Sequence, residues 1–226
     1  MENDCAIIQS IREELKPYSA VLVAVSKTKP NSEIEKVYAC GQRIFGENYV
    51  QELVLKHEQL PADIAWHFIG HLQSNKVKYI APFVSMIHSV DSENLLETIN
   101  AQAAKNKRII DCLLQVYIAK EETKFGVDES ELQKIIENYL AHNYSHIRLR
   151  GLMGMATNTD DMNIVQNEYK RLKSIFDTIA LLIEKEKHFD TLSMGMTGDY
   201  KIALECGSNM IRIGSKIFGE RNYNKL

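Results

Sequence analysis

Two lysines follow a run of apolar residues near the beginning of the chain. The segment "VLVAVSKTKP" occupies residues 21–30, so Lys27 and Lys29 come directly after a run that is typical of a buried strand. A lysine at the mouth of such a strand loses hydration, which lowers its pKa and leaves a nucleophilic amine able to form an imine with a carbonyl group. Both positions have the same strand parity, so alternation does not choose between them. Two ordinary solvated lysines are the alternative.

Glycine and hydroxyl residues near the C-terminus have the composition of a phosphate site. In "LSMGMT" and "IRIGS", Gly195 and Gly214 permit close approach of the backbone to a ligand. Ser193, Thr197 and Ser215 can donate hydroxyl hydrogen bonds. The simpler alternative is that each glycine only ends a strand. Because both glycines have neighbouring hydroxyls, we favour phosphate binding.

Arg212 narrows the class of ligand. It precedes Gly214 by two residues, so both lie on the same face of a strand, and a buried arginine needs an acceptor. That acceptor could be the carboxylate of Glu47 or a pyridine nitrogen, which would stay neutral because arginine keeps its proton. An amine, a phosphate site and this arginine together suggest pyridoxal 5'-phosphate (PLP). An aldolase that forms an imine with a phosphorylated sugar would also use the lysine and the phosphate site.

Eight strand-like apolar segments alternate with amphipathic helical segments along the chain. The strand-like segments are 21–26, 43–47, 64–70, 85–90, 109–118, 147–155, 189–195 and 209–214. Strict alternation implies parallel strands joined by helical crossovers, in an open doubly wound sheet or a closed barrel. Eight repeats favour an α/β fold of the TIM (β/α)8 barrel type with an extra N-terminal helix, as a single domain over residues 1–226. The candidate residues then gather at the carboxyl ends of the strands, where such barrels place their sites.

The composition excludes several classes of partner. Lys and Arg total 27 against 30 for Asp and Glu, so we expect no binding to nucleic acid or to a membrane. The N-terminal segment carries acidic residues in a helical pattern, unlike a secretory signal, so a cytoplasmic location is expected. The four cysteines, Cys5, Cys40, Cys112 and Cys206, show no metal-ligand spacing and are expected to be free thiols in a reducing compartment. Nothing marks a large exposed apolar interface, so a monomer is expected.

Several motifs, taken together, resemble those of one known family. They are "AVSKTKP", "FGENYVQE", "WHFIGHLQSNK", "KFG", "RGLM", "LSMGM" and "IRIGSKIFGER". The chain is similar over nearly its whole length to the pyridoxal phosphate homeostasis proteins, single-domain relatives of the N-terminal barrel of bacterial alanine racemase. One departure is Thr197, where relatives usually have serine, and it keeps the hydroxyl.

The resemblance implies a role for each candidate residue. By it, Lys27 forms the internal aldimine with PLP and Arg212 faces the pyridine nitrogen. The phosphate would be held by Ser193, Thr197, Gly214 and Ser215, and Asn48 and Met153 would line the cofactor. The resemblance also chooses Lys27 over Lys29, which the strand parity could not do.

The resemblance further implies a function in intracellular PLP (vitamin B6) homeostasis. The family is thought to bind the cofactor and hand it to apoenzymes, without an established reaction. Alanine racemase uses a second acid–base residue, a tyrosine from a separate C-terminal β-domain, and this chain has no residues left for such a domain. A PLP-dependent amino-acid racemase of low activity is the alternative.

Overall fold

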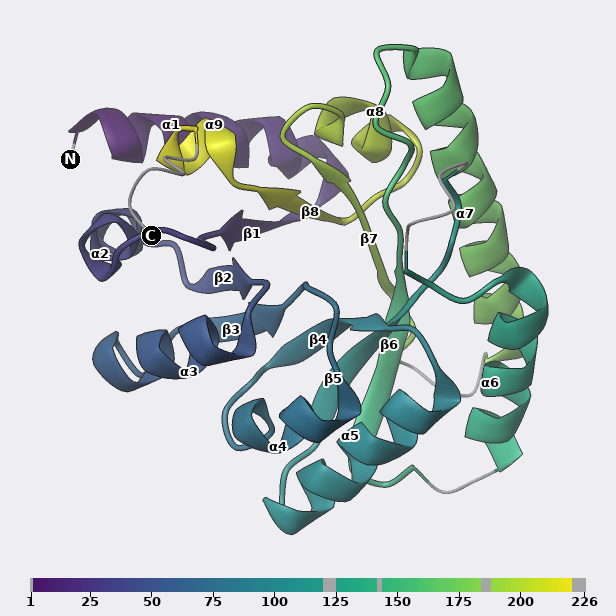
Figure 1. Ribbon diagram of the computed structural model, residues 1–226. Helices are drawn as coiled ribbons and strands as arrows, with labels where there is room; N and C mark the ends of the chain where they lie inside the picture. Colours follow the sequence, from purple (N-terminus) through teal and green to yellow (C-terminus); the bar gives the residue numbers. More distant parts are fainter. Residues whose placement is uncertain (1, 120–124, 142–143, 184–187, 221–226) are drawn as a thin grey trace.

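Eight parallel strands close into a barrel in the order in which they occur along the chain, as the computed structural model shows (Figure 1). The structure describes residues 2–119, 125–141, 144–183 and 188–220. The strands are β1 (Val21–Val25), β2 (Ile44–Glu47), β3 (Ala65–Phe68), β4 (Met86–Val90), β5 (Ile110–Gln115), β6 (Ile147–Met153), β7 (Thr191–Met196) and β8 (Met210–Ile213). The predicted α/β barrel is therefore confirmed. Each predicted segment overlaps one strand but is longer than it.

Helices connect the strands and cover the outside of the barrel. They are α1 (Glu2–Leu15), α2 (Asn31–Ala39), α3 (Val50–Gln59), α4 (Val77–Ile80), α5 (Glu93–Lys105), α6 (Glu129–Ala141), α7 (Met162–Leu182), α8 (Tyr200–Glu205) and α9 (Ser215–Phe218), with 3-10 turns η1 (Lys16–Tyr18) and η2 (Ser74–Lys76). The predicted N-terminal helix is α1, whose buried residues Ile8, Ile11 and Leu15 recur at helical spacing. Figure 1 shows α1 beside α9, so the first and the last described helices lie together.

The strands bury side chains on both faces, as expected for a barrel inside a ring of helices. The larger core lies between strands and helices and includes Phe45, Trp66 and Phe68. A smaller apolar cluster fills the barrel itself and consists of Val23, Met86, Leu113, Met153 and Met210. This inner cluster closes the barrel below its mouth, so a ligand at the carboxyl ends of the strands would rest on a packed floor.

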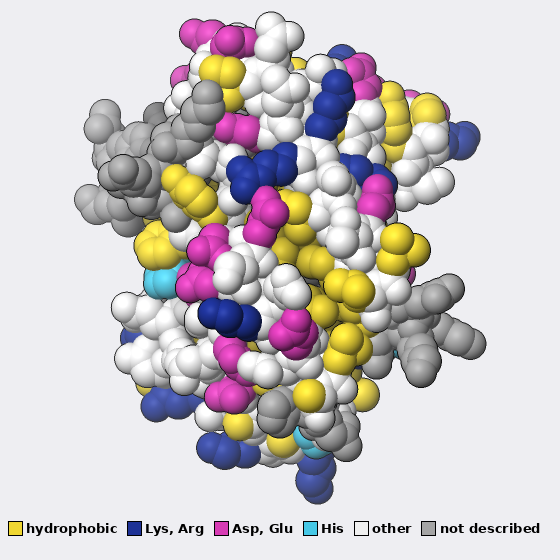
Figure 2. All heavy atoms as spheres, turned by 90° about the vertical axis from the view of Figure 1, so that its right-hand side faces the viewer, with side chains coloured by type: hydrophobic (Ala, Val, Ile, Leu, Met, Phe, Trp, Pro, Cys, Tyr) yellow, Lys and Arg dark blue, Asp and Glu magenta, His cyan; other side chains and the backbone are white. Residues whose placement is uncertain are grey.

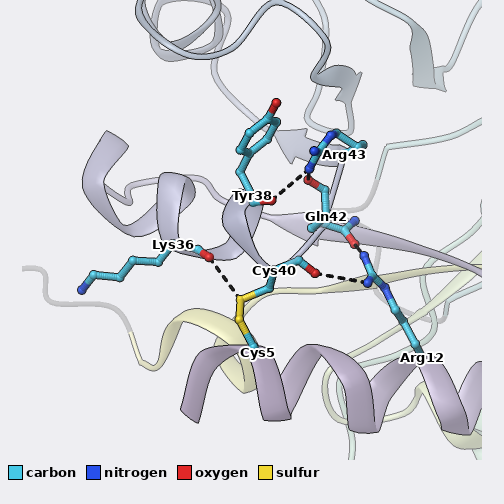
Figure 3. Close-up of a disulfide and its surroundings, with 7 residues drawn as sticks. All are labelled: Cys5, Arg12, Lys36, Tyr38, Cys40, Gln42 and Arg43. Atoms are coloured by element: carbon cyan, nitrogen blue, oxygen red, sulfur yellow. Dashed lines mark hydrogen bonds between the residues drawn. A yellow bond between two sulfur atoms is a disulfide. The ribbon is translucent and has the colours of Figure 1, made fainter. Parts of the chain in front are cut away.

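Cys5 and Cys40 form a disulfide that connects α1 to the end of α2 (Figure 3). Their Cα atoms lie 5.1 Å apart, and Arg12 of α1 donates a hydrogen bond to the carbonyl oxygen of Cys40 at 3.3 Å. The expectation of four free thiols is therefore wrong for these two. The pairing arises because α1 packs on α2, which no local spacing reveals. Cys112 and Cys206 are free and buried.

Hydrophobic side chains are exposed among charged ones on the side of the molecule that carries α6 and α7 (Figure 2). A groove of about 260 Å³ there is formed by these two helices alone, with Leu132, Ile136 and Ile175 among its lining residues. The expectation of a monomer rested on the lack of a marked apolar surface, and it stays a prediction. Within the described ranges, no helix has the length and apolar character to cross a membrane.

Candidate functional site

A pocket of about 530 Å³ opens at the carboxyl ends of the strands. Six of the predicted cofactor residues line it, namely Lys27, Asn48, Thr197, Arg212, Gly214 and Ser215. They come from the ends of β1, β2, β7 and β8 and from the residues that follow them. The structure therefore brings together the amine, the arginine and most of the hydroxyl and glycine residues that the sequence analysis singled out.

Two predicted residues, Ser193 and Met153, lie below the pocket and do not line it. Met153 belongs to the inner apolar cluster of the barrel. Ser193 is fully buried, and its Oγ accepts a hydrogen bond of 2.7 Å from Nη1 of Arg212. Gly195 also points away from the pocket, since a Cβ at this residue would lie 2.6 Å from Cβ of Ala203 in α8. The positive φ of Gly195, +96°, and its packing against α8 account for the glycine without a ligand.

Arg212 is 4 % exposed and forms part of the pocket floor. Its guanidinium donates to the carbonyl oxygen of Ser193 at 2.9 Å and to that of Gly154 at 3.1 Å, in addition to the Ser193 hydroxyl. Among the described residues, no carboxylate lies within ion-pair distance of it. Burial lowers the pKa of Arg212 from its usual value, because the charged form loses hydration.

Glu47 was the alternative partner of Arg212, and the structure contradicts that pairing. Oε1 of Glu47 accepts hydrogen bonds from Ser26 Oγ at 2.6 Å and from Lys56 Nζ at 2.7 Å. Among the described residues, Arg212 is thus a buried cation whose hydrogen bonds go to three neutral acceptors. Such a group favours a ligand that places an acceptor atom or a negative charge above it.

Two histidines extend the buried polar layer beyond Ser193. Nδ1 of His88 lies 3.1 Å from the Ser193 hydroxyl, and Nε2 of His88 lies 2.9 Å from Nδ1 of His67. Burial lowers the pKa of His67 to about 3 and that of His88 well below its usual value, so both rings are neutral. Arg212 can only donate hydrogen bonds. All three contacts are therefore satisfied when Arg212 donates to Ser193, Ser193 donates to His88, and His88 donates to His67. Neither histidine was among the predicted site residues, although the position of each within a strand segment was a signal for the barrel interior.

The two candidate lysines differ in their surroundings. Both line the pocket, and Lys27 is half-buried two residues after the end of β1. Nζ of Lys29 donates to the carbonyl oxygen of Phe218 at 2.6 Å and to that of Glu220 at 3.2 Å. Lys29 therefore connects the first loop of the barrel to the end of α9. This structural contact gives Lys29 a role that needs no ligand.

The loops after β7 and β8 meet at one edge of the pocket. The backbone N–H of Gly214 donates to Oγ1 of Thr197 at 3.3 Å, and Ser215 and Gly198 line the space beside them. A Cβ at Gly214 would lie 3.2 Å from the carbonyl oxygen of Val25, so the glycine permits close packing of β8 against β1. Backbone amides and hydroxyls gathered in this way can bind an anionic group such as phosphate.

Asn48 supplies a further sign that the pocket is built for a ligand. Its side chain lines the pocket, and its Oδ1 is buried without a hydrogen-bond partner. Leaving a buried amide oxygen unpaired costs free energy unless a bound molecule supplies a donor. The pocket thus gathers the amine of Lys27, hydroxyl and backbone amide donors, a buried cation and an amide, a set that suits a small molecule with a carbonyl and an anionic group.

Comparisons with known proteins show which family the chain is similar to. The family model for the alanine racemase N-terminal domain matches residues 6–222. The protein named pyridoxal phosphate homeostasis protein of Pasteurella multocida is 39% identical over 223 residues, which cover 97% of this chain and 94% of that protein. The protein of the same name from Escherichia coli K12 is 38% identical over 213 residues, covering 92% of this chain and 89% of that protein.

Solved structures of other proteins have the same fold over nearly the whole length of this chain. The structure of PipY from Synechococcus elongatus with PLP bound has a TM-score of 0.86 and 33% identity, and covers 96% of this chain and 100% of PipY. Alanine racemase from Bartonella henselae has a TM-score of 0.72 at 16% identity, and the match covers 58% of that longer chain, so it shows the fold alone. The chain therefore belongs to the pyridoxal phosphate homeostasis proteins, within the alanine racemase N-terminal domain family.

Proposed function

We propose that this protein binds PLP in the barrel-mouth pocket, as a Schiff base with Lys27, and serves intracellular PLP homeostasis. One observation carries the proposal: Lys27, Arg212 and the group of Thr197, Gly214 and Ser215 line a single pocket. The names of the relatives and the PLP bound to PipY support the same conclusion.

The chemistry of the pocket residues fits the groups of the cofactor. When bound, PLP would supply an electrophilic aldehyde, and Lys27 would supply the amine that pairs with it. Thr197 Oγ1, Ser215 and the amide of Gly214 would hold the phosphate. Arg212 would donate to the pyridine nitrogen, which stays neutral because arginine does not give up its proton. Asn48 would hydrogen-bond the ring substituents through its unpaired Oδ1.

The structure changes the role that we propose for Ser193. Its hydroxyl lies below the pocket and accepts a hydrogen bond from Arg212, so it would hold the guanidinium in place and would not contact phosphate. Met153 would support the cofactor through the inner apolar cluster, without lining the pocket.

Reduction with borohydride tests the covalent part of the proposal. After incubation with PLP, reduction and proteolysis, mass mapping should place the pyridoxyl group on Lys27. Lys27→Ala should lose the near-visible absorbance of the Schiff base and still fold, as circular dichroism would show. In Lys29→Ala, the label should remain on Lys27. A label on Lys29 in the wild-type protein would overturn the assignment.

Delivery to apoenzymes, a cytoplasmic location and a monomeric state complete the proposal. The pocket is open at the barrel mouth, and a Schiff base is reversible, so bound cofactor can leave. Mixing the loaded protein with a PLP-dependent apoenzyme, in the presence of a phosphatase that destroys free PLP, separates direct transfer from release. Recovery of enzyme activity under these conditions would support direct transfer, and sedimentation of the loaded protein would test the monomer.

A further inference from the structure

Charged side chains from β2 and α3 hold the residues on either side of Lys27. Lys56 Nζ of α3 donates to the carbonyl oxygen of Ser26 at 2.8 Å, and Oγ of Ser26 donates to Glu47 at 2.6 Å. On the other side, the backbone N–H of Thr28 donates to Oε1 of Glu52 at 2.6 Å. Both neighbours of Lys27 are therefore fixed by groups from β2 and α3.

The three charged side chains also bind one another. Lys56 Nζ lies 2.7 Å from Oε1 of Glu47 and 2.6 Å from Oε1 of Glu52. With the Ser26 carbonyl, the ammonium therefore has three acceptors for its three protons. Although this second lysine is only 4 % exposed, its protons are all engaged, which makes it a poor nucleophile. Lys56 thus has a positional function and does not compete with Lys27.

Such an ionic group is costly to bury. Glu47 is fully buried, and loss of hydration raises its pKa to about 7 despite the ammonium of Lys56. Well-packed apolar residues of similar volume often stabilise a protein as well as a buried ion pair does. Stability alone therefore does not explain why Glu47, Glu52 and Lys56 gather below the loop after β1.

The backbone of the held segment is unusual as well. Thr28 has a φ of +65°, in the left-handed region that a β-branched residue rarely adopts. The bond from its N–H to Glu52 and the bond from the N–H of Lys29 to the Ser26 carbonyl at 3.1 Å hold this conformation. Outliers of this kind persist when surrounding contacts determine them, and they occur frequently at functional sites.

We propose that Glu47, Glu52 and Lys56 are positioning residues that set the direction in which the Lys27 side chain leaves β1. The inference rests on the proposed function, because it concerns the lysine that forms the Schiff base. With the peptide groups before and after Lys27 fixed, its Cα–Cβ bond has one direction, and fewer conformations of the long side chain point away from the pocket.

Replacement of Glu52 tests the proposal, since this carboxylate is the most accessible of the three, at 24 % exposed. Glu52→Ala removes the acceptor of the Thr28 N–H, while Glu52→Gln keeps an oxygen at that place. The rate of Schiff-base formation is followed by its near-visible absorbance after mixing with PLP. Non-covalent binding is measured by calorimetry with pyridoxine 5'-phosphate, which lacks the aldehyde.

We expect Glu52→Ala to slow Schiff-base formation about tenfold, because misplacement of a reacting group by a fraction of an ångström has effects of this order. Glu52→Gln should recover most of the rate, and affinity for pyridoxine 5'-phosphate should change less than about twofold in both variants. Glu58→Ala, on the exposed face of the same helix, is the matched control and should behave as the wild type.

The outcomes separate this inference from the proposed function. If the wild type forms no Schiff base, the proposed function fails; if Glu52→Ala forms it at the wild-type rate, only the positioning role fails. Should Glu52→Ala not fold, Ser26→Ala tests the other side of Lys27 by removing the hydroxyl that donates to Glu47. An unchanged rate of Schiff-base formation in Ser26→Ala would then overturn the proposal.

Discussion

Arg212 donates a hydrogen bond of 2.7 Å to the hydroxyl of Ser193, from which a chain of contacts continues to His88. Ser193→Ala should therefore weaken binding of PLP and of pyridoxal, which lacks the phosphate, by the same factor. The carbonyl bonds of Arg212 remain, so we expect a loss of about 1–3 kcal/mol in the free energy of unfolding. Equilibrium dialysis with both compounds and urea unfolding measure the two effects. A selective loss of PLP binding would instead assign Ser193 to the phosphate.

Loss of the hydroxyls at the pocket edge should weaken binding of PLP but not of pyridoxal, unlike loss of the Ser193 hydroxyl. Thr197→Val and Ser215→Ala each remove one proposed phosphate donor, so PLP affinity should fall about five- to tenfold while pyridoxal affinity is unchanged. Thr197→Ser keeps the hydroxyl and is the control. Equal losses for both compounds would mean that these residues act on the fold of the loops and do not bind phosphate.

The general fold and most of the pocket could be predicted because they depend on local pattern and on one topological rule. Alternation of apolar runs with helical segments predicted the barrel, and the ends of its strands predicted a common rim for Lys27, Asn48 and Arg212. These inferences need only the order of the elements and the parity of each strand.

Ser193 could not be placed from parity because the register shifts along β7. Ser193 pairs with Met210 and Met196 pairs with Arg212, so one extra residue lies on β7 between these pairs. Such an irregularity changes which side chains face inward, and no sequence pattern marked it. The Cys5–Cys40 disulfide and the Lys56 cluster depend similarly on how helices pack on their neighbours, since each joins separate elements of the fold.

The disulfide between Cys5 and Cys40 should contribute to stability, because it closes a loop with a sequence separation of 35 residues. In the chain-entropy account, a loop of this length corresponds to about 3–4 kcal/mol, so reduction should lower the melting temperature. The double variant Cys5→Ser with Cys40→Ser should melt at the temperature of the reduced protein and not respond to reductant. Thiol titration of the unfolded, unreduced protein that found all four cysteines reactive would contradict the disulfide.

The stability of the barrel should depend on pH through His67. Burial lowers its pKa to about 3, whereas in the unfolded chain it takes up a proton below about 6.5. The unfolded state therefore binds more protons between these values, and stability is lost as the pH falls through this range, by at most about 1.4 kcal/mol per pH unit. Glu47 acts in the opposite direction, because its pKa is raised to about 7 in the folded protein. Its contribution to stability is lost as the pH rises from about 4.5 to about 7.

Comparison with His67→Asn isolates the contribution of His67, since the asparagine cannot titrate and Glu47 is present in both proteins. Urea unfolding at pH 7 and pH 5 should show that acidification destabilises the wild type more than the variant, by up to about 2 kcal/mol. His88 titrates in the same direction, so the variant should keep part of the acid sensitivity. An equal effect of pH on both proteins would show that His67 is not held neutral.

The protein loaded with PLP should show no appreciable turnover of common amino acids. Racemisation requires a proton to leave one face of the substrate and return to the other, so two acid–base groups must lie on opposite sides of the cofactor. Among the described pocket residues there is no tyrosine, histidine or cysteine; Lys29 lies in the same loop as Lys27 and donates to the carbonyl oxygens of Phe218 and Glu220, and Glu220 itself is exposed. The hydroxyl of Tyr200 donates to Glu14 at 2.6 Å, outside the pocket. Arg212 would also keep the pyridine nitrogen neutral, which weakens the ring as an electron sink. Incubation with L-alanine and L-serine in deuterated water, followed by NMR, should give α-proton exchange no faster than free PLP does. Steady exchange over many turnovers that disappears in Lys27→Ala would make the racemase the better account of the pocket.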